Sequence, residues 1–245
     1  TPKLKKETKE LSAGSLNRML STIRRYLAYL GDMDYPIPIS PNDIKLVKMP
    51  RPHPRVAEFD ALVELIESPF RFEKTKKLKL RNRAMLETLF ATGMRISELT
   101  SLNRDQIDKT GRIFIRGKGK KERFVYLTER AKAHIKNYVD TRDDDNPALF
   151  IPYRGRNTGK PSARISTNYV QMKMKQYRTR LGINVPTSPH SLRHGFATYL
   201  AEQGANPAAI QILLGHESLH TTTRYVHASD KYAEKTHRQF HPLKK

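Results

Sequence analysis

The chain has 245 residues, 37% of them apolar, which is enough for a sizeable core in one large domain or two unequal ones. Lys and Arg number 46 against 24 acidic residues, and the net charge of +22 favours a polyanionic partner, nucleic acid in particular. The absence of cysteine excludes disulfides, thiolate metal sites and a thiol nucleophile. The alternative to a nucleic-acid partner is a highly soluble basic protein without one. No apolar run approaches the roughly 18 residues of a membrane span, so we expect a cytoplasmic protein.

The first predicted element is an amphipathic helix. Apolar residues recur at helical spacing from Leu16 to Leu30, with Ser15 available as N-cap and Gly31 as the stop. One helix cannot bury its own apolar stripe, so we expect residues 1–35 to belong to a helical domain whose other helices lie outside this chain. Because the chain opens in a charged lead-in without Met, we also expect a preceding segment. The opposite helix face carries arginines expected to meet DNA phosphates, or else only solvent: Arg18, Arg24 and Arg25.

Six prolines between Tyr35 and Arg55 indicate a semi-rigid interdomain linker over 36–55. A second domain is expected over 56–245. Its first predicted elements are a short helix with Leu62, Leu65 and Ile66, a basic loop over 71–79, and the apolar helix RAMLETLFAT stopped by Gly93.

The period then changes from helical spacing to alternation. Two strands over 112–116 and 123–127 are predicted, joined by the hairpin GKGKKE, and a third over 149–151. The later segments predict helices over 167–181, 190–203 and 207–215 and in the tail after Ser229, and one more that follows Thr128. Thr128 can cap this helix, and Ser188 and Asn206, each followed by Pro, are the predicted caps of the helices over 190–203 and 207–215. The predicted fold class is therefore mainly α with a small antiparallel β-sheet (α+β).

Several of these segments carry side chains suited to phosphodiester chemistry. His190 and Arg193 are three residues apart and can share a helix face. With Arg95, Arg193 can clamp the non-bridging oxygens of a phosphate under attack. Tyr225 offers a nucleophilic hydroxyl if a proton acceptor lies close, and Lys118 at the hairpin tip can protonate the leaving oxygen. The guanidiniums do the work that a metal does in nucleases, so no metal is expected.

Each feature also has an ordinary explanation. Most tyrosines serve packing or the surface, and a Gly-Lys-Gly hairpin is most often only a turn. His190 and His194 have the spacing of a zinc helix, but no Glu lies between them to act as the base. The joint order and spacing of the residues carries the argument.

Four motifs together resemble the tyrosine site-specific recombinase family, most closely its Xer branch. They are ATGMRISELTSL, GKGKKER, HSLRHGFAT and LLGHESLHTTTRYVH. The resemblance extends from about Val56 to Leu243, and the helix up to Leu30 resembles only the last helix of the family's core-binding domain. It implies that residues 1–35 are the end of a helical, SAM-like core-binding domain and that 56–245 is the catalytic domain.

The resemblance also implies roles for individual residues. Tyr225 corresponds to the nucleophile that forms a 3′-phosphotyrosyl link, and Lys118 to the general acid. Glu98 corresponds to an acidic position that orients Arg95. The remaining catalytic positions implied are Arg95, Arg193, His190 and His216. Further DNA contacts are expected from Lys120, Lys121 and Arg123.

As an assembly, the resemblance implies two domains that clamp duplex DNA at a specific recombination site, and a homotetramer that synapses two duplexes. The tail from about Ser229 is expected to dock into a neighbouring subunit. Because the phosphotyrosine stores the energy of the broken bond, no cofactor is expected.

Alternatives remain open from sequence alone. A chromosome-acting Xer enzyme and an integrase of a phage or conjugative element share this chemistry. A type IB topoisomerase shares it too, but acts as a monomer without a specific site. A relative that binds DNA without catalysis is the alternative of a different class, and it would be insensitive to Tyr225→Phe.

Overall fold

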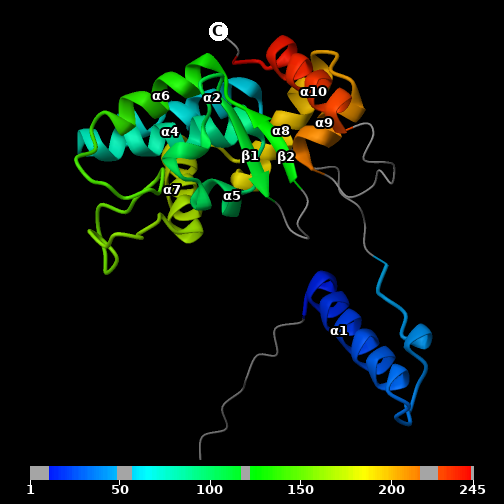
Figure 1. Ribbon diagram of the computed structural model, residues 1–245. Helices are drawn as coiled ribbons and strands as arrows, with labels where there is room; N and C mark the ends of the chain where they lie inside the picture. The colour runs from blue at the N-terminus through cyan, green and yellow to red at the C-terminus, as the bar shows by residue number, and fades with distance from the viewer. Residues whose placement is uncertain (1–10, 49–56, 117–121, 216–225, 244–245) are drawn as a thin grey trace, which may run out of the picture. The chain divides into compact units, whose positions relative to one another are not determined.

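The computed structural model describes residues 11–48, 57–116, 122–215 and 226–243, the side chains of 226–232 excepted. The chain divides into two compact units, Thr1–Pro54 and Arg55–Lys245 (Figure 1). The described residues of the smaller unit are helical, and those of the larger one add a two-stranded antiparallel sheet. The predicted fold class is confirmed, while the predicted domain boundaries stay predictions.

The smaller unit is built on helix α1, Ala13–Asp32. Ser12 is its N-cap, because its Oγ accepts a hydrogen bond from the Ser15 backbone N–H at 3.2 Å. The predicted cap Ser15 and the predicted stop Gly31 are therefore wrong, and both lie inside the helix. The positive φ that a helix end favours falls instead at Asp34, at 57°.

After α1 the chain folds back along the helix. Arg24 Nε donates to Pro41 O at 3.1 Å, and Asn17 exchanges hydrogen bonds of 2.9 and 2.8 Å with the backbone of Val47. The described part of the predicted linker thus packs on α1. Leu27 is buried, whereas other apolar side chains of α1 are exposed within this unit: Met19, Ile23, Tyr26 and Tyr29.

Helix α4, Lys76–Thr92, forms the centre of the larger unit, and all its residues from Leu80 onward are buried. Thr75 caps it by accepting from the Leu78 N–H at 3.3 Å. The basic loop predicted over 71–79 is therefore wrong, since a capped helix occupies its second half. Helix α6, Glu129–Val139, runs alongside α4 (Figure 1). The short helices α2, Phe59–Glu67, and α3, Pro69–Phe72, also pack on α4.

Buried charges on α4 are paired with charges on its neighbours. Arg83 Nη2 lies 2.7 Å from Glu87 Oε1 and 3.0 Å from Glu67 Oε1 of α2. Arg130 Nε of α6 lies 2.8 Å from the same Glu87 oxygen. Charges buried without partners would strongly destabilise the fold, so this network holds α2, α4 and α6 in one arrangement.

The sheet is a single hairpin of β1, Arg112–Arg116, and β2, Glu122–Tyr126. Ile113 pairs with Val125 and Ile115 with Arg123, so the predicted pair of strands is confirmed, with β2 one residue earlier. The third strand predicted over 149–151 is wrong, because Ala148 makes only an isolated bridge to Asn103.

The remaining helices pack around α4 and the hairpin. Ser188 caps α8 and Asn206 caps α9, both as predicted, and Gly215 ends α9 in the left-handed conformation. Figure 1 shows α8, α9 and α10 gathered beside β2, where they form a second apolar core. The remaining bounds are α5, Ile96–Ser101; α7, Thr167–Arg180; α8, Pro189–Glu202; α9, Pro207–Leu214; α10, Val226–Phe240; and the 3-10 turns Pro41–Asp43 and Arg104–Gln106.

Candidate active site

Arg95 lies directly after the left-handed turn that ends α4. Gly93 has a φ of 60°, and Arg95 is the N-cap residue of α5. The Arg95 backbone N–H donates to Glu98 Oε2 at 2.7 Å, and Arg95 Nη1 donates to Glu98 Oε1 at 3.1 Å. Glu98 thus holds both the backbone and the guanidinium, while 42% of the Arg95 side chain stays exposed. An exposed guanidinium on a fixed backbone suits an incoming oxyanion.

Arg193 lies on α8 and is buried. Its Nη1 donates to Gly93 O at 2.7 Å, and its Nη2 donates to Leu214 O, which ties α8 to the turn after α4 and to the end of α9. Burial, with the charges of Arg95 and Arg123 nearby, lowers the pKa of Arg193 to about 10. The guanidinium therefore stays charged at neutral pH.

Arg123, one of the predicted DNA contacts, lies inside the protein. It lies on β2 and is only 8% exposed. Its Nη1 and Nη2 donate to the two oxygens of Glu98 at 3.0 and 2.8 Å, and its Nε donates to Leu213 O at 3.0 Å. Since the guanidinium is buried and bonded inside the protein, Arg123 is poorly placed for the predicted contact with DNA, which stays a prediction.

Three arginines from three elements converge on the end of α9. The last carbonyls of a helix have no partner within it and carry the negative end of its dipole. Here each is paired with a guanidinium: Leu213 O with Arg123, Leu214 O with Arg193, and Gly215 O with Arg95, the last at 3.4 Å. The end of α9 therefore holds three guanidiniums close together. Such a concentration of positive charge can stabilise the phosphorane, the negatively charged intermediate geometry of a phosphate under attack.

Glu98 supplies the negative charge within this cluster. Burial alone would raise its pKa, but the hydrogen bonds and charge of Arg123, together with those of Arg95, outweigh burial and lower the pKa below its usual 4.5. Glu98 is therefore ionised at neutral pH. It links α5 to β2 and fixes Arg95 relative to Arg123.

His190 lies in the first turn of α8, at the start set by Ser188 and Pro189. Of the two residues expected on one face, Arg193 is buried and His190 is exposed. His190 Nε2 lies 2.9 Å from Nε2 of His194, one helical turn further along α8. Burial, His194 and Arg193 lower the pKa of His190 below 6.5, so its imidazole is neutral at neutral pH and can accept a proton.

The remaining predicted catalytic residues lie outside the described residues. Lys118 falls in 117–121, together with the predicted DNA contacts Lys120 and Lys121; His216 and Tyr225 fall in 216–225.

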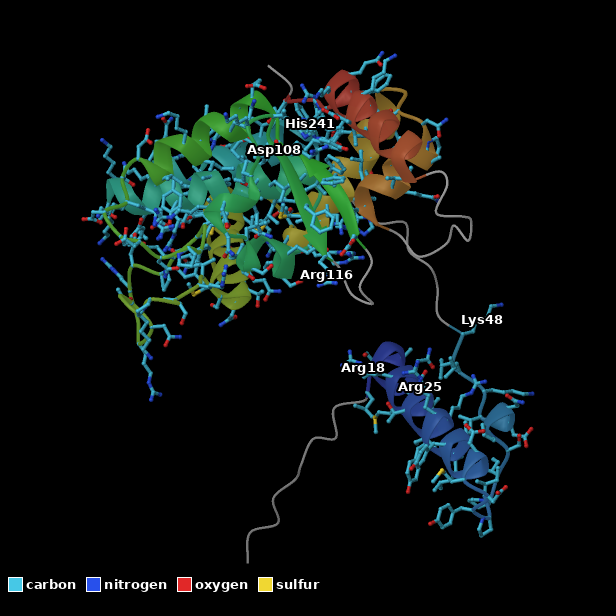
Figure 2. The ribbon with its side chains drawn as sticks, in the orientation of Figure 1. Arg18, Arg25, Lys48, Asp108, Arg116 and His241 are labelled. Atoms are coloured by element: carbon cyan, nitrogen blue, oxygen red, sulfur yellow. The ribbon has the colours of Figure 1, made fainter. Side chains whose placement is uncertain are left out.

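The predicted DNA contacts on α1 differ from one another. Arg18 and Arg25 are exposed on this helix (Figure 2). Arg24 is half-buried, because its Nε is bonded to Pro41 O. Arg18 and Arg25 are therefore better placed than Arg24 to meet phosphates.

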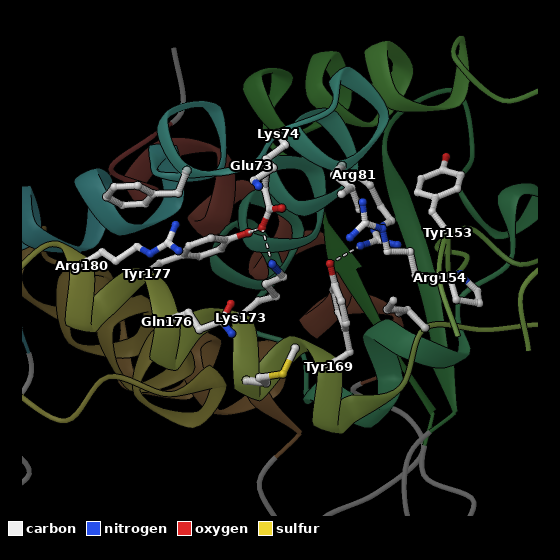
Figure 3. A pocket seen from close by; sticks show the side chains of 15 residues that line it. Glu73, Lys74, Arg81, Tyr153, Arg154, Tyr169, Lys173, Gln176, Tyr177 and Arg180 are labelled. Atoms are coloured by element: carbon white, nitrogen blue, oxygen red, sulfur yellow. Dashed lines mark hydrogen bonds and ion pairs between the residues drawn. The ribbon is translucent and has the colours of Figure 1, made fainter. Parts of the chain in front are cut away.

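A cavity of about 330 Å³ lies at the other end of α4 (Figure 3). Arg81 lines it, and twelve residues separate Arg81 from Gly93, roughly 18 Å along a helix axis. Glu73 Oε1 accepts from Tyr177 Oη at 2.5 Å and from Lys173 Nζ at 2.8 Å. Burial and this bond to Glu73 raise the pKa of Tyr177, so it is a poor nucleophile. The described members of the predicted catalytic set do not line this cavity.

Within the described ranges, no group of three or more His, Cys, Asp or Glu is arranged to hold a metal ion. His190 and His194 offer two imidazoles, fewer than the three protein ligands of a catalytic zinc site. Over the same part of the chain, no helix is long and apolar enough to span a bilayer.

Comparison with known proteins agrees with the motifs. Residues 57–232 match the Phage integrase family. The chain is 36% identical over 246 residues to the tyrosine recombinase XerC of Thermodesulfovibrio yellowstonii. The alignment covers 96% of this chain and 78% of that protein.

Solved structures give the same picture. The crystal structure of XerA recombinase aligns with a TM-score of 0.59 and 25% identity, over 95% of this chain and 85% of that one. The XerH recombinase bound to its difH substrate, in a pre-cleavage complex, aligns with a TM-score of 0.66 and 22% identity. The alignment covers 93% of this chain and 65% of the XerH chain. At 22% identity, the second likeness shows the fold alone.

Proposed function

This chain belongs to the phage integrase family and is an Xer-like tyrosine recombinase, a site-specific DNA strand-transfer enzyme, and from that premise we propose how its residues act. The Tyr225 hydroxyl attacks the scissile phosphorus and gives its proton to His190. The 5′ oxygen leaves with a proton from Lys118, and a 3′-phosphotyrosyl bond remains. The 5′ hydroxyl of a partner strand then attacks that bond and restores the tyrosine. The step consumes neither nucleotide nor metal.

During this step Arg95 and Arg193 bind the non-bridging oxygens. The observation that carries the proposal is the convergence of both guanidiniums on the end of α9. Gly215 accepts from Arg95 and is followed directly in sequence by the segment with His216 and Tyr225. Because the segment with Tyr225 begins directly after Gly215, the chain itself links the nucleophile to the site of Arg95 and Arg193. Before cleavage, a phosphate oxygen replaces Gly215 O as the partner of Arg95, whereas Arg193 binds the phosphate while it keeps Gly93 O and Leu214 O.

The Xer names of its relatives favour the Xer branch over an integrase of a mobile element and over a DNA-binding relative without catalysis. We place the protein in the cytoplasm, where it resolves chromosome dimers. A homotetramer synapses two duplexes. In it the tail from about 229 leaves its own α4, where His237 and His241 are bonded, and docks into a neighbouring protomer. Residues 1–35 complete a core-binding domain, 36–55 link it to the catalytic domain, and 56–245 carry the chemistry. Phosphate contacts come from Arg18, Arg25, Lys120 and Lys121, with Arg24 placed less favourably.

Covalent trapping tests the proposal. The chain and its Tyr225→Phe variant are incubated with sheared, lightly nicked genomic DNA of the source organism, and the mixtures are resolved on a denaturing gel. We expect a protein–DNA adduct from the wild type that is absent from the variant. Sequencing the trapped DNA then identifies the target site.

Three results would contradict the proposal. If the wild type binds DNA but yields no adduct, the non-catalytic alternative holds. If adducts fall at unrelated sequences and supercoiled plasmid is relaxed by the monomer, the topoisomerase alternative holds. An adduct that survives in Tyr225→Phe would assign the nucleophile to another residue.

A further inference from the structure

Arg123 links three elements of the larger unit: its own strand β2, helix α5 and helix α9. From β2 it holds both oxygens of the Glu98 carboxylate on α5, and its Nε holds Leu213 O at 3.0 Å on α9. A Cβ added to Gly215 would lie 3.0 Å from Arg123 Cδ, so the aliphatic stem also packs on the end of α9. The side chain is thus committed to the interior.

We propose that Arg123 is a positioning residue for strand cleavage, which orients Glu98 and, through it, the phosphate-binding guanidinium of Arg95. The inference rests on the proposed function, because it requires Arg95 to bind the scissile phosphate. The planar fork of Arg123 matches two carboxylate oxygens in a way that a lysine ammonium cannot. By holding Leu213 O, Arg123 also fixes the end of α9, just before the segment with Tyr225.

The charges around Glu98 explain why the loss of Arg123 matters. Arg95 faces Glu98 from the start of α5 and Arg123 faces it from β2, with the charge of Arg193 on α8 close by. The neighbouring part of α9 presents carbonyl oxygens to these arginines. Burial favours the protonated form of Glu98, and Arg123 gives the largest opposing contribution. Without Arg123 the pKa of Glu98 rises, and a protonated Glu98 binds the Arg95 guanidinium less well.

The test compares Arg123→Met with the double variant Arg123→Met/Glu98→Gln. It measures single-turnover adduct formation on a duplex that carries the target site identified by covalent trapping. We expect Arg123→Met to slow cleavage about a hundredfold at pH 7.5, since it leaves a buried carboxylate without its partner. The loss should deepen as the pH falls towards 6. The double variant should recover roughly tenfold and lose this pH dependence, because the unpaired charge is gone and a glutamine oxygen still accepts from Arg95.

Two further variants make the test independent of misfolding. Arg123→Lys keeps a compensating charge but loses the fork, so we expect a folded protein with cleavage slowed roughly tenfold. Arg116→Met is the matched control on the same hairpin. Its ion pair with Glu122 is 3.4 Å long and the Arg116 side chain is 68% exposed, so cleavage should change less than about twofold.

Other outcomes would overturn the inference. One such outcome is that Arg123→Met weakens DNA binding, and lowers the salt dependence of binding by the amount expected for about one phosphate contact, while bound DNA is cleaved normally. Arg123 would then be a DNA contact. If cleavage falls equally at every pH and the double variant is no better than the single one, Arg123 serves only the fold. A wild type without an adduct would instead refute the proposed function itself.

Discussion

At the level of single residues, Arg193 bridges two carbonyls that no local contact brings together. Its terminal nitrogens reach Gly93 O and Leu214 O, on different sides of the cluster. A lysine has one ammonium on a flexible stem and cannot bridge both while facing a phosphate. We expect Arg193→Lys to slow single-turnover adduct formation by about 10² to 10³-fold, the range for loss of a preorganised donor. DNA affinity, which depends on many phosphates, should change less than about fivefold.

Arg71→Lys is the control for this variant. Its side chain is 69% exposed and lies 3.8 Å from Glu64, a separation at which an exposed ion pair contributes little. It should cleave like the wild type. Equal losses of affinity and cleavage in Arg193→Lys would instead show that this arginine serves general DNA binding.

The sequence predicted Arg95, Glu98 and Arg193 as neighbours in function because local spacing and motif order identify them. It did not identify Arg123 as an interior residue, because a basic residue beside a lysine-rich hairpin looks like a surface residue. A signal for the correct assignment was present in the strand alternation. Arg123 shares the inward face of β2 with Val125, and its register partner is the buried Ile115. An inward-facing arginine needs an acidic partner, which Glu98 provides.

At the scale of elements, the turn that ends α4 leaves little room for a residue larger than glycine, so a substitution there should lower the stability of the larger unit. Gly93 has a φ of 60°, and an added Cβ would lie 2.5 Å from Phe196 Cδ1. A left-handed alanine costs about 1 kcal/mol, and the steric clash adds roughly 1 to 3 kcal/mol. We therefore expect Gly93→Ala to lower Tm by about 4 to 15 °C, as measured by circular dichroism.

Gly182→Ala separates the two causes. Gly182 has a similar φ of 70°, but an added Cβ meets nothing within 4 Å. Only the backbone penalty of about 1 kcal/mol applies, so Tm should fall by about 2 to 4 °C. Equal shifts in the two variants would show that the contact with Phe196 contributes nothing.

Several helix ends in the larger unit were predictable from the sequence, whereas both predicted ends of α1 were wrong. The caps Thr128 and Ser188 and the stop Gly93 act through bonds within one turn, which sequence reveals. The third strand failed for a tertiary reason: Arg142 Nη1 donates to Leu149 O at 3.0 Å, and the Leu149 N–H donates to Leu102 O at 2.8 Å. The Arg142 side chain and the backbone at the end of α5 thus use the hydrogen bonds that a neighbouring strand would have made.

Across the whole molecule, composition predicted the partner, because net charge adds up regardless of where the residues lie. The packing of the tail was not predictable, because its contacts have no local signal. His237 Nε2 bonds Ala91 O across 146 residues, and His241 Nε2 lies 3.3 Å from Phe90 O across 151 residues. These bonds attach α10 to the last turn of α4, next to the turn that carries Arg95.

This attachment should make the larger unit sensitive to acid. Burial lowers the pKa of His237 from 6.5 to about 4, so the folded state stays neutral while the unfolded state binds a proton. As the pH falls from 6.5 to 4, the unfolded state is favoured by up to about 3 kcal/mol. His237→Gln keeps an N–H for Ala91 O but does not titrate, so its unfolding free energy should fall that much less between pH 7 and 4. Urea unfolding followed by circular dichroism measures the difference, with the exposed His194→Gln as control. Parallel pH curves for His237→Gln and the wild type would show that His237 takes up its proton without leaving α4.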